Sequence, residues 1–102
     1  MSALSDALLE FLEEHPGEAF TADELFESIP WPGRVYSSHV QQALERRLLP
    51  ERLVLAEGDL RQEGKFVKSD PATRWFAVEG APAGLVAYVP GEGLCRCDWM
   101  SG

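Results

Sequence analysis

The sequence predicts an α+β fold in which helices come first and strands follow. Three observations lead to this prediction. Apolar residues recur at helical spacing up to about residue 49, runs of β-branched and aromatic residues follow, and a glycine-rich turn separates two further apolar runs near the C-terminus. The length of 102 residues and a hydrophobic content of 45% are typical of one small globular domain.

The first two helices are expected before residue 30. Along residues 2–14 the apolar side chains lie three and four positions apart and form one stripe of Leu4, Leu8, Phe11 and Leu12. Thr21 and Glu24 have the spacing of a capping box, in which each side chain accepts a hydrogen bond from the other residue's backbone N–H. We therefore expect a second helix to begin after Thr21 and to end at Pro30.

A third helix is expected from about Arg34 or Ser37 to Leu49, and Pro50 ends it. Its inward stripe consists of Val40, Ala43, Leu44 and Leu48. The period of about 3.6 residues then turns the opposite side toward solvent. That outward side consists of Ser38, His39, Gln42, Glu45 and Arg46, with Gln41 at its border.

Two strands are expected next, over residues 53–57 and 73–78, because both runs are rich in β-forming residues. A polar stretch from residue 61 to residue 70 connects them. The order helix, helix, turn, helix, strand, polar loop, strand defines the expected domain, residues 1–79.

Residues 80–102 are expected to form a C-terminal β-hairpin. Two apolar runs, residues 85–89 and 94–99, surround the turn Pro90-Gly91-Glu92-Gly93. An isolated hairpin is marginally stable in water. We therefore expect this extension to pack on the domain or on another chain.

The order of elements in residues 1–79 resembles the winged helix-turn-helix superfamily, with a layout similar to that of bacterial repressors. Four segments carry the resemblance: residues 20–25 in the second helix, 39–44 in the third, and 52–55 and 73–78 in the wing strands. The resemblance implies that the third helix enters the major groove of DNA and that the wing contacts the backbone. It assigns no subfamily.

Charge is distributed unevenly along the chain. The formal net charge of −8 disfavours nucleic acid, because affinity for phosphate comes mainly from Lys and Arg. Eight of the nine bases nevertheless lie between residues 34 and 76, whereas residues 1–33 contain eight acids and no base. Such asymmetry can reflect a binding face, although it can also arise by chance.

The expected DNA contacts combine the third helix with the wing. Gln suits adenine, Arg suits guanine or phosphate, and Ser suits either, while basic wing residues suit backbone phosphates. The candidate set is Arg34, Ser37, Ser38, His39, Gln41, Gln42, Arg46, Arg61, Lys65 and Lys68. Glu45 is expected on the same face, where it would repel phosphate. One domain of this size contacts few base pairs, so a transcriptional regulator of this kind is expected to bind a two-fold site as a homodimer.

A different function is also compatible with the sequence. The same fold could serve as a protein–protein interaction module that uses the acidic first helix or the C-terminal hairpin. The acidic residues Glu10, Glu13, Glu14, Glu18 and Glu27 could imitate DNA and inhibit a nucleic-acid enzyme, or they could simply be solvated. Trp31, if exposed, would be a contact anchor for a protein partner.

No catalytic, metal or cofactor site is expected. His39 has no second His and no Ser or Cys placed by a motif to act as its nucleophile, so no enzymatic activity is expected. Cys95 and Cys97 share one side of an expected strand with Trp99 and are interpreted as buried apolar side chains, with a redox or metal role as the alternative. Trp31 and Trp75 are interpreted as packing in the core or at the domain edge. Because no run reaches the roughly 20 apolar residues of a membrane span and the N-terminus lacks bases, a cytoplasmic location is expected.

Overall fold

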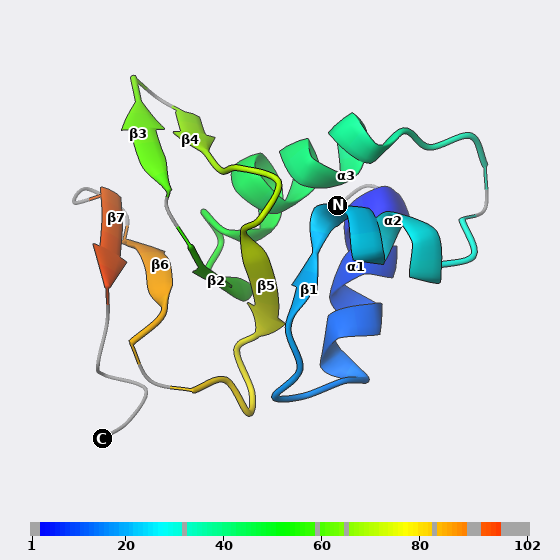
Figure 1. Cartoon of the computed structure of the whole chain (residues 1–102), viewed down its shortest axis with the longest axis horizontal. Coiled ribbons are helices and arrows are strands. Elements are labelled where there is room, and N and C mark those ends of the chain that lie inside the picture. Colours follow the sequence, from blue (N-terminus) through cyan, green and yellow to red (C-terminus); the bar gives the residue numbers. More distant parts are fainter. Residues whose placement is uncertain are drawn as a thin grey trace.

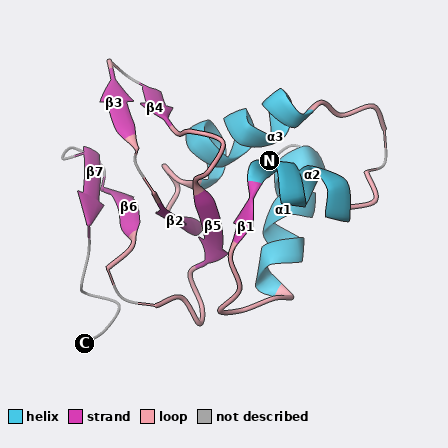
Figure 2. Ribbon diagram, in the orientation of Figure 1, coloured by secondary structure: helices cyan, strands magenta, loops and turns pink. Residues whose placement is uncertain are grey.

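A computed structural model of the chain describes residues 3–31, 33–58, 60–64, 66–82, 84–89 and 93–96. The helical elements are α1 (Ala3–Glu13), α2 (Ala22–Ser28), α3 (Ser37–Ala43) and the π-helical segment η1 (Leu44–Leu48). The strands are β1 (Phe20–Thr21), β2 (Val54–Glu57), β3 (Arg61–Glu63), β4 (Phe66–Lys68), β5 (Arg74–Ala77), β6 (Val86–Val89) and β7 (Gly93–Arg96). The expected α+β class is confirmed, and the helices gather on one side of the molecule (Figures 1 and 2).

The main sheet has five strands in the order β1-β5-β2-β6-β7, and every neighbouring pair is antiparallel. The expected strands β2 and β5 pair over their full length, whereas the short strand β1 was not expected from the sequence. Strands β6 and β7 form the expected hairpin. Since β6 joins the sheet beside β2, with Ala56 opposite Val86, the hairpin packs on the rest of the same chain.

The polar stretch between β2 and β5 is more ordered than a loop. Strands β3 and β4 pair with each other and form a separate two-stranded sheet, called the arm from here on. The arm stands beside the C-terminal part of the third helix (Figure 1), and β4 packs against η1. The arm therefore belongs to the same surface as the third helix.

Two apolar clusters lie on opposite faces of the sheet, because side chains alternate along each strand. On the helical face, Val54, Ala56, Trp75 and Ala77 pack with Leu8, Leu12, Leu25, Val40, Leu44 and Leu48. On the other face, Leu55 and Phe76 lie directly opposite each other and pack with Leu85 and Ala87 of the hairpin region. The hairpin therefore completes the second cluster.

Local signals in the sequence account for the helix boundaries. The capping box is present: the Thr21 N–H donates to Glu24 Oε1 at 2.8 Å, and the Glu24 N–H donates to Thr21 Oγ1 at 3.1 Å. The third helix begins at Ser37 and runs to Leu48, within the expected range. Its last part is π-helical, since the Leu49 N–H bonds the Leu44 carbonyl five residues earlier at 3.0 Å. Within the described residues, no helix is long and apolar enough to cross a membrane.

Candidate nucleic-acid interface

The third helix presents an exposed side opposite its buried stripe. Ser38, His39, Gln42 and Arg46 are exposed, as expected, while Val40, Ala43, Leu44 and Leu48 are buried. Ser37 is the exposed first residue of α3, and exposed Arg34 lies in the preceding loop. The exposed side therefore carries hydrogen-bond donors and acceptors together with one guanidinium group.

Glu45 does not belong to this exposed side, which corrects the expectation from helical periodicity. Its side chain is buried, with a relative exposure of 5%. One carboxylate oxygen accepts hydrogen bonds from the backbone N–H and from the hydroxyl of Ser69, both at 2.6 Å. Ser69 directly follows the arm, so the arm covers the side of the helix that periodicity assigns to solvent.

Gln41 shares this contact with Glu45. Its amide Nε2 donates to the carbonyl oxygen and to the hydroxyl of Ser69, both at 3.2 Å, and its side chain is half-buried. The amide of this candidate DNA contact is therefore used within the chain. Gln41, Glu45 and Ser69 together are called the arm clamp below.

Arg46 is positioned by the arm as well. Its guanidinium carbon lies 4.6 Å from the centre of the Phe66 ring, which is the geometry of a cation–π contact. Phe66 is a large hydrophobic residue that is exposed, with a relative exposure of 49%. The contact holds the charged group of Arg46 at the junction between helix and arm while both side chains face solvent.

The basic residues expected in the wing have different surroundings. Lys68 of β4 lines a hollow of about 180 Å³ together with Ser38, Gln42 and Arg46, so it adds positive charge beside the exposed side of the helix. Arg61 of β3 lies 3.7 Å from the carboxylate of Glu63, and both side chains are exposed. Lys65 lies outside the described residues.

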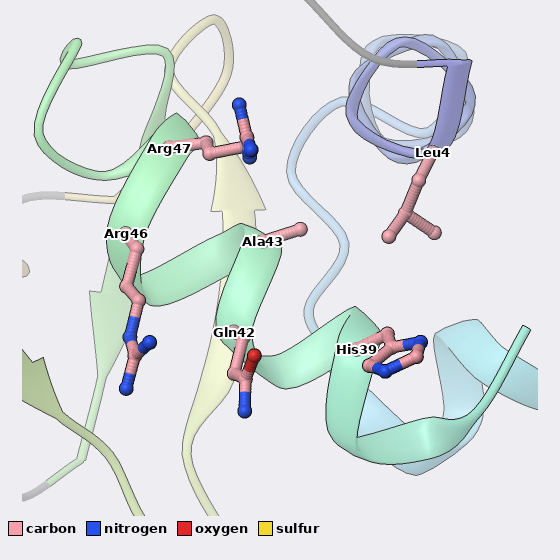
Figure 3. Close-up of a pocket in the computed structure, with 6 residues that line it drawn as sticks. All are labelled: Leu4, His39, Gln42, Ala43, Arg46 and Arg47. Atoms are coloured by element: carbon pink, nitrogen blue, oxygen red, sulfur yellow. The ribbon is translucent and has the colours of Figure 1, made fainter.

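A second, larger hollow of about 470 Å³ lies between α1 and the third helix. It is lined by Leu4, His39, Gln42, Ala43, Arg46 and Arg47. Figure 3 shows Arg47 and His39 at opposite ends, with Leu4 of α1 facing Ala43 of α3 between them. Sequence reasoning did not include Arg47 or Leu4 in a site, because their proximity depends on how α1 packs against the third helix.

Trp31, Trp75 and Cys95 line neither of these two hollows. Trp75 is buried in the core, as expected. Trp31 is half-buried, packs against the core and donates its indole N–H to the Phe26 carbonyl at 2.9 Å. Cys95 packs against the cluster around Leu55 and Phe76, while Cys97 and Trp99 lie outside the described residues. In the part of the chain that the structure describes, His, Cys, Asp and Glu nowhere form a group of three or more that could hold a metal ion.

Comparisons with protein-family models, with curated proteins and with solved structures found no match for this chain.

Proposed function

We propose that the chain is a winged helix-turn-helix domain that binds duplex DNA, with the third helix reading bases and the arm as the wing. The order of elements supports this proposal. Two helices, α2 and α3, precede the antiparallel pair β2 and β5, and the arm projects between these two strands beside the third helix. A helix with one exposed side and an adjacent two-stranded ribbon suits a groove and its flanking backbone.

One observation carries the DNA-binding proposal. Ser38, Gln42 and Arg46 line one hollow with Lys68 of the arm. Side chains that suit hydrogen bonds to base edges therefore lie beside a cation that suits phosphate. Glu45 lines the same hollow, but its carboxylate is buried and bonded to Ser69. The Glu45 carboxylate is therefore held by Ser69 and does not project into solvent.

We further propose that the protein acts as a homodimer. A single third helix contacts only a few base pairs, and specific sites for such domains are read by two copies about one helical turn apart. Two-fold symmetry is the commonest arrangement of soluble oligomers. Sedimentation of the free protein and of its DNA complex tests the stoichiometry.

The central experiment is titration of random duplex DNA at low and at moderate salt. We expect binding at low salt that weakens steeply as salt rises, because Lys and Arg release counterions from phosphate. The variants Arg46→Ala and Lys68→Ala should each weaken binding and reduce the salt slope by about one where the residue contacts phosphate. Arg52→Ala is the matched control, since Arg52 lines a different hollow with Glu13 and Glu79. Absence of binding at low salt would refute the proposal.

A second candidate is contact with a basic protein surface. The exposed residues Glu10, Glu13, Glu14, Glu18 and Glu27 form no ion pair with described residues, so no described cation neutralises their charge. Such an array complements a basic partner, including one that normally binds DNA. Failure to bind DNA, combined with salt-sensitive inhibition of a purified nucleic-acid enzyme that Glu10→Gln/Glu14→Gln relieves, would favour this function. Retained DNA binding without any such inhibition would exclude it.

A further inference from the structure

The hollow between α1 and the third helix combines positive charge with an apolar wall. Among the described residues, its lining includes Arg46, Arg47 and His39 but no carboxylate, although the whole chain has a formal net charge of −8. The wall between Arg47 and His39 is formed by Leu4 and Ala43 (Figure 3). Charge and apolar surface are therefore both concentrated at one place.

Arg47 is the cation best placed for a ligand. Its side chain points to the same side of the helix as Ala43, whereas Arg46 points away from Leu4 (Figure 3) and lies over the Phe66 ring. Arg47 is exposed and forms no ion pair with any described residue. A guanidinium group binds a carboxylate through two parallel hydrogen bonds, so Arg47 has unused capacity for such a partner.

The opposite end offers a further donor. His39 is exposed, and its ring lies edge-on to the Tyr36 ring with centroids 5.4 Å apart. A neutral imidazole always has one N–H donor, and the Gln42 amide at the rim provides two more. The volume of about 470 Å³ lies within the usual range for small-molecule sites, which is roughly 300–1,000 Å³.

We propose that this hollow binds a small organic anion, a carboxylate carried on a short alkyl chain or an aromatic ring. The carboxylate would pair with Arg47, and the apolar body would lie against half-buried Leu4, with the nearly buried Ala43 below it. An inorganic anion or a bare phosphate would leave the apolar wall in contact with water. The two apolar side chains therefore distinguish an organic acid from a simple ion.

Binding at this site would also affect DNA. His39, Gln42 and Arg46 line the hollow and belong to the proposed DNA-reading side, so the two ligands would compete. This consequence rests on the proposed function. The binding site itself does not, because the organic anion can be titrated without DNA.

The test is a titration of the ¹⁵N-labelled chain with acetate, butyrate, hexanoate and benzoate, followed by NMR. We expect saturable shifts at Leu4, His39, Ala43 and Arg47, with affinity rising up to about fourfold for each added methylene that contacts the wall. Arg47→Ala should weaken hexanoate and benzoate binding about tenfold or more. Arg52→Ala is the control, because exposed Arg52 lines a different hollow with Glu13 and Glu79. Benzyl alcohol, which lacks the charge, should not bind.

Several outcomes would overturn the proposal. One is NMR shifts that do not saturate as the anion is added. Others are an unchanged affinity of Arg47→Ala for hexanoate and benzoate, or an equal affinity of the wild type for phosphate, acetate and hexanoate. The chain-length series tests the apolar wall without any substitution in the protein. In a parallel experiment, hexanoate should displace a fluorescent DNA duplex from the wild-type chain. Anion binding without any DNA binding would refute the proposed function and leave this site intact.

Discussion

The carboxylate of Glu45 in the third helix accepts two hydrogen bonds from Ser69, which lies 24 residues further along the chain. Both distances are 2.6 Å, and Gln41 donates to the same serine from one turn earlier in the helix. The arm clamp therefore links the third helix to the segment that leaves the arm. It also keeps the Glu45 side chain buried, beside the hollow lined by Ser38, Gln42, Arg46 and Lys68.

The arm clamp should contribute measurably to stability. Glu45→Ala leaves the N–H and the hydroxyl of Ser69 without their acceptor, so we expect the free energy of unfolding to fall by about 2–3 kcal/mol. Urea denaturation measures this change, and faster hydrogen exchange at the Ser69 amide would locate it. Glu51→Ala, at an exposed neighbouring position, should change stability by less than about 0.5 kcal/mol. Unchanged stability in Glu45→Ala together with tighter DNA binding would instead support an outward Glu45.

The contact between Arg46 and Phe66 should be detectable as a coupling. A double-mutant cycle of Arg46→Ala with Phe66→Leu removes the cation and the ring separately and together. We expect a coupling of about 0.5–1 kcal/mol, the usual strength of an exposed cation–π contact. Arg47→Ala with Phe66→Leu is the control cycle, because Arg47 lies on another side of the helix (Figure 3). Equal coupling in both cycles would contradict a specific contact.

The capping box should stabilise α2, which has only seven residues. Thr21→Ala removes the oxygen that accepts the Glu24 N–H, so we expect a loss of about 1 kcal/mol in the free energy of unfolding. Thr21→Ser keeps the hydroxyl and should retain most of the stability. Chemical denaturation followed by circular dichroism compares the three chains. A loss of the same size in Thr21→Ser would assign the effect to the methyl group and its packing in β1.

Arg52 offers a stabilising substitution. Its φ angle is +60°, a left-handed conformation that disfavours side chains with a Cβ atom. Arg52→Gly should raise the free energy of unfolding by about 0.5–1 kcal/mol, even after the greater freedom of glycine in the unfolded chain is included. Arg52→Ala keeps the Cβ atom and should bring no such gain. Thermal denaturation of both variants checks this expectation, which fails if alanine stabilises as much as glycine.

The hairpin region should be required for a stable domain. Leu85 has a relative exposure of 5% and packs with Leu55 and Phe76 on the second face of the sheet. Leu85→Ala should therefore cost about 2–4 kcal/mol, whereas Glu79→Ala at an exposed position should cost less than about 0.5 kcal/mol. Urea denaturation distinguishes the two. If Leu85→Ala is as stable as the wild type, the packing of Leu85 on the second face of the sheet does not stabilise the domain.

Local patterns in the sequence were sufficient to predict most of the secondary structure. The spacing of Thr21 and Glu24 located the start of α2, because a capping box involves residues only three positions apart. The apolar stripe of the third helix identified its buried side, since Val40, Ala43, Leu44 and Leu48 repeat with the helical period. Strand β1 was missed because two residues are too short to show an alternating pattern.

The candidate site was predicted only in part. Ser38, His39, Gln42 and Arg46 are exposed as expected, because each lies opposite the buried stripe. Arg47 and Leu4 were missed as neighbours because they belong to different helices, and nothing in the sequence indicates how closely α1 approaches the third helix. The short strands of the arm were missed because their residues are mostly polar and exposed.

By itself, the sequence determined the helices, the longer strands and which side of the third helix is buried, because these depend on neighbours within a few residues. Only the tertiary structure decided which part of the remaining helix surface is free. Gln41 and Glu45 meet Ser69 across 28 and 24 positions, and a hydrogen bond over that separation leaves no periodic pattern in the sequence. Glu45, which was expected to face outward and repel phosphate, therefore forms the contact that holds the segment after the arm against the third helix.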